Sequence, residues 1–266
     1  MNRRTHDHEY FGTVSIENGW VPAPGYVLRR QRILATLEPL LRGSLLEVGC
    51  GAGALVRDLH AMGFSCTALE MGGEAREIAR RICADRPGLQ IHSEPRPDWT
   101  GRFDYVLAFE VLEHIEDDRA AAEQWRSWLK PDGKLILSVP AHPERWNVSD
   151  VWAGHFRRYT RASLHAVLES AGLAVGHFET YGFPLINLIE PVRALHHGRR
   201  LRERSKAGDM REASAHSGID RTLETRLYPL QSSRVGVGIL KLCARLQEIF
   251  RNRELGTGYL ITASRR

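Results

Sequence analysis

Residues 45–53 read Leu45-Leu46-Glu47-Val48-Gly49-Cys50-Gly51-Ala52-Gly53, so an apolar run passes directly into three alternate glycines. Glycine lets the backbone turn sharply and approach a ligand closely, as happens where a strand leads into a nucleotide-binding helix. The pattern therefore predicts a strand over residues 44–48 and a nucleotide-binding turn after it. The carboxylate of Glu47 would repel a pyrophosphate, whereas it would attract a cofactor that carries a positive charge.

Strands and helices alternate from residue 44 to about residue 172. Apolar runs predict strands over 44–48, 65–69, 89–92, 103–109, 134–139, 174–181 and 258–263. Helical periodicity predicts helices over 26–41, 54–62, 74–84, 118–129, 160–171, 186–200 and 235–250, and a turn is predicted over 130–133. This order predicts an α/β fold with a Rossmann-like, doubly wound sheet of seven mainly parallel strands. Ligands of such sheets lie beyond the carboxyl ends of the strands.

The chain divides into four predicted parts. They are an N-terminal helical cap (1–43), a cofactor-binding core (44–182), a helical insertion (183–256) and the final strand of the core (257–266). The insertion has apolar stripes beside basic residues, namely Arg193, Arg199, Arg200, Arg202, Arg204, Lys206 and Arg211. It predicts a lid or a homodimer interface, with peripheral membrane contact or a lipid-like substrate as the second interpretation. Nucleic acid is a weaker prediction, because the arginines are not interleaved with aromatic residues.

The composition indicates a globular protein with an ordinary core. The chain has 266 residues, of which 42% are hydrophobic, and its net charge of +5 is compatible with an anionic partner. Its four cysteines, Cys50, Cys66, Cys83 and Cys243, lack the paired spacing of a disulfide framework or a zinc site. No apolar window reaches the length of a membrane span, and residues 1–12 are too polar for a secretory signal. We therefore expect a reduced, cytoplasmic protein.

Glu70 supplies the second part of the cofactor pattern. It lies 17 residues after Gly53 (70 − 53 = 17), at the end of the second predicted strand. A carboxylate there can accept hydrogen bonds from both ribose hydroxyls of an adenosine. A dinucleotide-binding oxidoreductase would need its third glycine at Ala54, so that class is disfavoured.

Several ordered blocks between residues 44 and about 182 resemble the class I S-adenosylmethionine (SAM)-dependent methyltransferases. The blocks are 47–53, Glu70, 103–106, 109–115 and 129–135. The resemblance implies that Gly49, Gly51 and Gly53 face SAM, that Glu70 binds its ribose, and that Met71 packs on its adenine. By the same resemblance Glu47, Phe109 and Glu110 border its methionine end. Ser93-Glu94 is the candidate for the acidic residue that the family has after the third strand.

The catalytic candidates follow the fourth predicted strand. Glu110-Val111-Leu112-Glu113-His114 is predicted to open a helix, which would place Glu110, Glu113 and His114 on one face. Together with His155, such a group can hold a divalent ion. The block resembles the ubiquinone-pathway O-methyltransferases and the small-RNA 3′-end ribose 2′-O-methyltransferases, the second of which bind Mg²⁺. The resemblance implies that Glu110, Glu113, His114 and His155 are metal ligands and that the metal lowers the pKa of the substrate hydroxyl.

Other interpretations of these residues stay open. His114 or His155 can serve as a catalytic general base without a metal. Glu110 can instead contact the amine of the cofactor. Glu113 can be a solvated acid in the first turn of a helix, where the helix dipole favours negative charge.

The substrate side of the site is predicted to be aromatic. The segment 10–26 is rich in aromatic residues and proline, and His142, Trp146 and Trp152 flank the loop after the fifth strand. The sequence as a whole predicts a SAM-dependent methyltransferase of a small-molecule acceptor, at oxygen rather than nitrogen, with an apolar or lipid-like substrate. The alternatives are a metal-dependent RNA 2′-O-methyltransferase and a non-catalytic SAM-binding protein.

Overall fold

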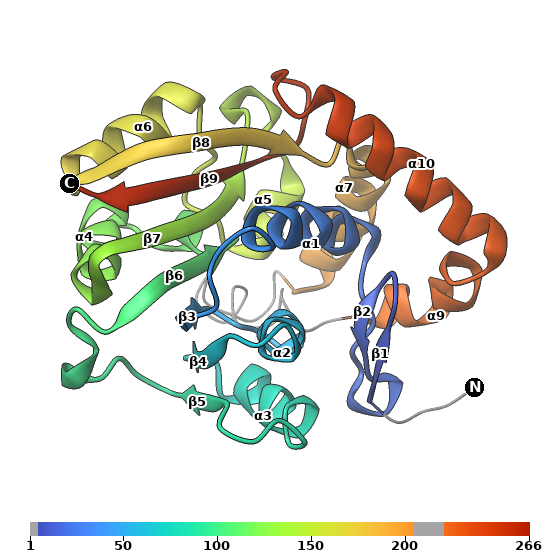
Figure 1. The fold of residues 1–266 in the computed structure, drawn as a ribbon. Coiled ribbons are helices and arrows are strands. Elements are labelled where there is room, and N and C mark those ends of the chain that lie inside the picture. Colours follow the sequence, from blue (N-terminus) through green and yellow to red (C-terminus); the bar gives the residue numbers. More distant parts are fainter. Residues whose placement is uncertain (1–4, 205–220) are drawn as a thin grey trace.

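A single sheet of seven strands organises the computed structural model, which describes residues 5–204 and 221–266. The strand order is β5-β4-β3-β6-β7-β9-β8, and β9 runs antiparallel to both of its neighbours while the other pairs are parallel (Figure 1). The strands are β3 (Ser44–Val48), β4 (Ser65–Leu69), β5 (Gln90–His92), β6 (Phe103–Phe109), β7 (Leu129–Pro140), β8 (Leu173–Tyr181) and β9 (Gly258–Arg265). The predicted Rossmann-like fold is thus confirmed.

Helices cover both faces of the sheet (Figure 1). One face carries α1 (Pro24–Leu37), α2 (Ala54–Ala61) and α3 (Gly73–Ile82), and the other carries α4 (Asp118–Trp128) and α6 (Arg161–Ser170). Alternate strand residues point to opposite faces. Leu45 and Leu107 therefore lie in one core, and Leu46 and Val106 lie in the other. Because both faces are buried, the central strands are continuous apolar runs, which is why the sequence predicts them so well.

The N-terminal part contains more than the predicted helix. Strands β1 (His6–His8) and β2 (Gly12–Val14) form an antiparallel hairpin, and a short 3-10 helix (Ile16–Asn18) leads toward α1. The hairpin packs on α2, where the Thr13 hydroxyl donates to Asp58 at 2.9 Å. Such short strands depend on this tertiary contact, so the sequence pattern does not reveal them.

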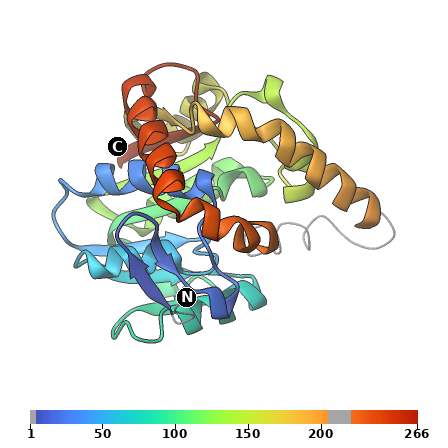
Figure 2. The same cartoon turned by 90° about the vertical axis from the view of Figure 1, so that its right-hand side faces the viewer.

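The insertion before the last strand is helical, as predicted. It comprises α7 (Leu185–Arg204), α9 (Thr222–Gln231) and α10 (Arg234–Phe250), while α5 (Val148–Ala153) lies just before α6. Figure 2 shows α9 and α10 lying along the outside of the molecule, with α7 diverging from them. α10 packs on α1, and α7 packs on α5. The predicted basic residues Lys206 and Arg211 lie outside the described residues.

Two local predictions are wrong. Residues 130–133, predicted as a turn, belong to β7, whose pairing with β6 begins with Leu129 opposite Phe103 and has an irregular register. Residues 110–114 do not open an α-helix, because only a 3-10 turn forms, over Leu112–His114. Among the described helices, none has the length and apolar character needed to cross a membrane.

Candidate active site

The three glycines of the turn share a backbone conformation but differ in their surroundings. All have left-handed dihedral angles, with φ of 67° at Gly49, 53° at Gly51 and 76° at Gly53. A Cβ at Gly49 would lie 2.6 Å from Val111, and one at Gly53 would lie 3.0 Å from Ala79. A Cβ at Gly51 would have no heavy atom within 4 Å. A side chain at Gly49 or Gly53 would therefore clash with its neighbours, whereas Gly51 borders open space.

Two carboxylates flank this turn. Glu70, at the end of β4, accepts hydrogen bonds from the backbone N–H groups of Gly51 (2.7 Å) and Gly72 (2.8 Å), so it joins the second strand to the turn. Glu47 is buried, and one of its carboxylate oxygens has no hydrogen-bond partner among the described residues. Burial raises the pKa of Glu47 to about 8. Met71 is 75% exposed beside Glu70, and Ser93 and Glu94 are exposed after β5.

A cavity of about 330 Å³ lies at the carboxyl ends of the strands. Its wall includes Glu47, Gly49, Gly51, Phe109, Glu110, His114 and His155, all of them predicted site residues. The other predicted site residues, Gly53, Glu70, Met71 and Glu113, do not line it. The fold thus brings the cofactor turn and the predicted catalytic residues to one hollow, where ligands of doubly wound sheets bind.

Glu110 is held apart from the other acidic candidate. Its backbone is left-handed, with φ of 58°, an uncommon conformation for a residue other than glycine. The Tyr181 hydroxyl donates to Glu110 at 2.6 Å, the Ser138 hydroxyl donates at 2.9 Å, and Arg29 lies 3.4 Å away. Burial opposes ionisation of Glu110, but Arg29 and these hydrogen bonds outweigh it and lower its pKa. The predicted shared helix face of Glu110, Glu113 and His114 is therefore wrong.

Glu113, His114 and His155 form a compact group. One potential ligand atom from each lies within 4.8 Å of the others, and Glu110 is not part of the group. Glu113 is fully buried, and neither of its carboxylate oxygens has a hydrogen-bond partner from another described residue. Burial and the nearby charge of Glu110 raise its pKa. The interpretation of Glu113 as a solvated helix acid is therefore wrong.

Asp150 orients His155. The Nδ1 atom of His155 lies 3.0 Å from Asp150 Oδ1, and its Nε2 atom faces Glu113 Oε1 at 3.9 Å. Asp150 is itself fixed, because it forms a capping box with Asn147 at the start of α5 and accepts a hydrogen bond from Arg158. Although burial opposes its ionisation, the hydrogen bonds from His155 and Arg158 lower the pKa of Asp150 to about 2. The imidazole therefore sits against a permanent negative charge.

The His114 ring lies 4.7 Å from the His155 ring, edge to face. Burial, and then the nearby His155, lower the pKa of His114 to about 4. His114 is therefore neutral near pH 7, and a nitrogen of a neutral imidazole can accept a proton or bind a cation.

The substrate side is only partly as predicted. Trp20, Tyr26 and Trp152 line the cavity. Trp146 and His142 do not, because Trp146 is 41% exposed and His142 packs on Tyr259.

The sequence interpretation did not assign the charged residues of the cavity wall to the site. These are Arg29, Arg30, Asp150, Arg158, Glu190, Arg193 and Arg221. In α7 the wall residues Ile186, Glu190, Arg193 and His197 recur at helical spacing, and this was the available signal.

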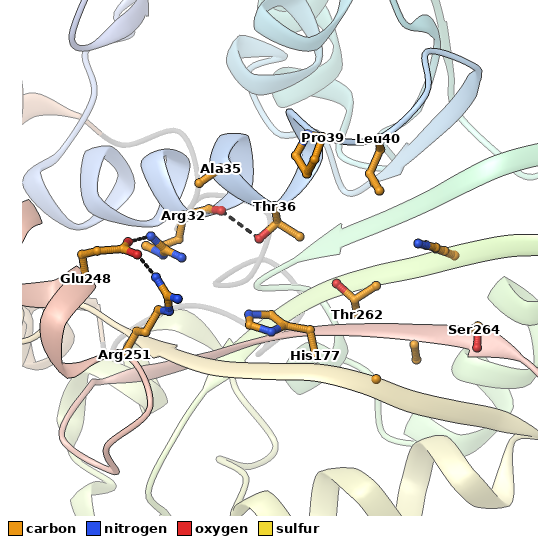
Figure 3. Close-up of a pocket in the computed structure, with 13 residues that line it drawn as sticks. Arg32, Ala35, Thr36, Pro39, Leu40, His177, Glu248, Arg251, Thr262 and Ser264 are labelled. Carbon is orange, nitrogen blue, oxygen red and sulfur yellow. Dashed lines mark hydrogen bonds and ion pairs between the residues drawn. The ribbon is translucent and has the colours of Figure 1, made fainter.

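A second hollow, of about 630 Å³, lies between α1 and strands β8 and β9 (Figure 3). Its lining includes none of the predicted site residues. Figure 3 shows Glu248 between Arg32 and Arg251, and Arg32 also binds the buried Glu179 through two hydrogen bonds of 2.8 Å. This network ties α1, β8 and α10 together, so we assign it a structural role.

Comparison with known proteins identifies the family. A family model described as a methyltransferase domain matches residues 26–177. The chain belongs to this family. With its sheet topology and glycine turn, it is a member of the class I SAM-dependent methyltransferases.

Curated relatives include ubiquinone biosynthesis O-methyltransferases. The one from Xanthomonas axonopodis pathovar citri is 31% identical over 148 residues, which cover 50% of this chain and 61% of the relative. The one from Sodalis glossinidius is 28% identical over 149 residues, which cover 53% of this chain and 59% of the relative. The matches thus span about three fifths of the length of these relatives.

Solved structures share the fold. A SAM-dependent methyltransferase from Mesorhizobium loti has a TM-score of 0.54 at 16% identity, covering 91% of this chain and 98% of that chain. A second match is a chain of the complex between the Haloferax volcanii Trm112 methyltransferase activator and a putative methyltransferase. It has a TM-score of 0.55 at 18% identity, and the match covers 88% of this chain and 86% of that chain. At this identity the likeness concerns the fold alone.

Membership of the methyltransferase family implies SAM as the cofactor, and the residues of the turn fit it. Gly51 borders open space that a side chain would enter, as a close backbone approach to a ligand requires. The buried carboxylate of Glu47 has one oxygen without a hydrogen-bond partner among the described residues, and a cationic ligand would satisfy it. Met71 offers an exposed apolar side chain next to Glu70, as expected where a flat base packs.

Proposed function

We propose that this methyltransferase transfers a methyl group from SAM to a hydroxyl oxygen of a small, apolar or lipid-like acceptor. The observation that supports this best is the cavity, which contains both the glycine turn and the oriented imidazole of His155. Its aromatic wall residues Trp20, Tyr26 and Trp152 suit an acceptor with an apolar body. The names of the curated relatives support oxygen as the atom that is methylated.

The cofactor side of the proposal assigns a role to each predicted residue. The backbone of Gly49, Gly51 and Gly53 would hold SAM, Glu70 its ribose and Met71 its adenine. Glu47, Phe109 and Glu110 would border its methionine end. When bound, SAM supplies an activated methyl group, so the main task of the chain is to align the acceptor oxygen.

His155 would act as the general base. Asp150 keeps Nδ1 engaged, so Nε2 is the nitrogen that can take the proton from the acceptor hydroxyl. The negative charge of Asp150 would stabilise the imidazolium that results. His114, neutral and beside it, would orient the acceptor or share the proton.

A metal-assisted variant is the second candidate, favoured by the buried carboxylate of Glu113, which accepts no hydrogen bond from the other described residues. Glu113, His114 and His155 would be the ligands, and a bound divalent ion would lower the pKa of the acceptor hydroxyl. Asp150 would then orient the metal-bound ring of His155 through the hydrogen bond at Nδ1, as carboxylates commonly do for histidine ligands. Two imidazoles and one carboxylate suit Mn²⁺, Fe²⁺ or Zn²⁺ better than the predicted Mg²⁺.

Glu113→Gln separates the two variants, because glutamine mimics a protonated carboxyl. Without a metal, burial favours the protonated form of Glu113, so we expect the methyl transfer rate of Glu113→Gln to stay close to that of the parent. With a metal, the variant would lose the ion that elemental analysis finds in the parent, and EDTA would abolish parent activity. Asp150→Asn is the matched control, since it weakens the orientation of His155 in both cases.

The acceptor class needs its own test. Methylation of phenolic and lipid-like hydroxyl compounds, measured with radiolabelled SAM, would support the proposal. Methylation of RNA at the ribose, with affinity that falls steeply as salt rises, would favour the RNA alternative instead. Tight SAM binding without transfer to any acceptor would favour a non-catalytic protein. Absence of SAM binding in calorimetry would refute all three.

A further inference from the structure

The exposed large apolar side chains are concentrated on the helical insertion. Among the residues that the structure describes, ten of the sixteen lie on α7, α9 and α10, and the strongest stripe is on α10. There Val235 is 71% exposed, Ile239 52%, Leu242 58% and Ile249 70%. Leu223, Leu227 and Leu230 are exposed on α9, which leads into α10 through Ser232 and Ser233.

These side chains face away from the protein. Tyr228 of α9 and Leu240 of α10 pack inward, against the N-terminal residues Phe11 and Val14. At helical spacing, Leu230 and Leu242 each lie on the face opposite the inward residue of their helix. Figure 2 shows both helices on the outer surface of the molecule. Each of the two helices therefore has exposed apolar side chains on the side that faces away from the core.

Basic side chains border the apolar stripe. Arg234, Lys241 and Arg245 are exposed on α10, and Arg226 is exposed on α9. These two helices contain two acidic residues. Glu224 forms an ion pair with Arg221. Glu248 lies between Arg32 and Arg251 and pairs with both. The outer surface of the described helices is therefore apolar and positively charged, with its acids already paired.

We propose that the apolar and basic surface of α9 and α10 binds the surface of an anionic lipid bilayer. A helix that lies in a membrane interface has this combination of an apolar face and flanking Lys or Arg. Anionic headgroups complement the basic side chains, each of which strengthens binding by roughly fivefold near such a surface. In a symmetric dimer through this surface, a second copy would bring another basic stripe, and the described acids of its α9 and α10 are already paired.

The surface lies next to the cavity. Arg221, the N-cap residue of α9, lines the cavity and stacks over Trp20 at 4.8 Å. A bilayer-bound molecule would therefore hold its cavity close to the lipid phase, where an apolar acceptor resides. This use of the surface rests on the proposed function, whereas the lipid binding itself does not.

Co-flotation with vesicles tests the proposal on the full chain. We compare vesicles of phosphatidylcholine with vesicles that also contain phosphatidylglycerol, and expect binding to the anionic vesicles. Ile239→Ser with Leu242→Ser should reduce that binding at least tenfold, and Lys241→Glu with Arg245→Glu should reduce it more. The matched controls are Leu41→Ser, an 86% exposed side chain elsewhere, and Arg81→Glu, and both should bind like the parent.

Several results would overturn the inference. One is absence of parent binding to anionic vesicles, and another is equal binding by the surface variants. A third is a dimer in light scattering that Ile239→Glu dissociates, which would assign the surface to a second copy. Each variant must also keep SAM binding in calorimetry, which shows that it is folded. Loss of methyl transfer with intact vesicle binding would count against the proposed function alone.

Discussion

At the scale of single residues, Gly51 separates ligand binding from packing. Its Cβ would meet no atom, yet its φ of 53° makes any other residue strained by roughly 1–2 kcal/mol. We expect Gly51→Ala to lower stability by that amount and to weaken SAM binding by on the order of tenfold or more, because the methyl group enters the cofactor space.

Gly101→Ala is the matched control for that substitution. Gly101 has φ of 64°, and its Cβ would also meet nothing within 4 Å. The two variants should show similar shifts in thermal unfolding, and calorimetry should show weakened SAM binding only for Gly51→Ala. Equal SAM affinity in both would show that Gly51 does not face the cofactor.

Glu47 should make the SAM-free protein less stable as pH rises. Its folded pKa of about 8 exceeds the ordinary value of 4.5, because the carboxyl is buried. Between these two values the folded state keeps a proton that the unfolded state loses. The contribution of Glu47 to the free energy of unfolding is therefore fully present below about pH 4.5 and is lost as pH rises through 8. The loss is at most roughly 1.4 kcal/mol per pH unit.

Urea unfolding across that pH range measures the effect. In Glu47→Gln, the free energy of unfolding should fall less steeply with pH than in the parent. Some of the fall should remain, because the pKa of Glu113 is also raised. A variant with the same slope as the parent would show that Glu47 is already ionised in the folded state.

The residue types of the site were predictable, but their arrangement was not. The block 110–114 was identified from its place after the fourth predicted strand, and His155 from the family resemblance. The structure brings Glu113, His114 and His155 together. The left-handed backbone of Glu110 depends on partners such as Tyr181, which is 71 residues away in the chain. Helical periodicity takes no account of such distant hydrogen bonds, so Glu110 was wrongly placed on the face of Glu113.

At the scale of elements, the Arg32 network holds three segments together. Arg32 of α1 pairs with the fully buried Glu179 of β8 and with Glu248 of α10. Arg32→Ala would leave the Glu179 charge buried with weaker partners, so we expect a loss of roughly 3 kcal/mol in the free energy of unfolding. The control Arg119→Ala removes an exposed pair with Glu123 and should cost under about 1 kcal/mol in denaturant unfolding. Equal losses in the free energy of unfolding for the two variants would mean that the buried network does not stabilise the fold more than an exposed ion pair does.

Element prediction succeeded where the signal is local. β3, β4 and β6 have the predicted bounds, because each is an apolar run that polar or glycine residues end. The hairpin of β1 and β2 was missed, since its three-residue strands are fixed by contact with α2 rather than by their own pattern.

At the scale of the whole molecule, the cavity joins all four predicted parts of the chain. Trp20 comes from the N-terminal part, Gly49 from the core, Glu190 from the insertion and Thr257 from the final segment. A ligand in this cavity should therefore stabilise the molecule as one unit. S-adenosylhomocysteine at about 100 times its Kd should add roughly 2.7 kcal/mol, which corresponds to a rise in Tm of roughly 5–10 °C.

Differential scanning calorimetry of the full chain distinguishes one unit from several. We expect a single transition that shifts as a whole when the ligand is added, because the packing of α10 on α1 and the Arg32 network couple the insertion to the core. Two transitions, of which only one shifts, would mean that the insertion unfolds independently of the cofactor site. In that case its wall residues, such as Glu190 and Arg193, would contribute to acceptor binding without contributing to the stability of the core.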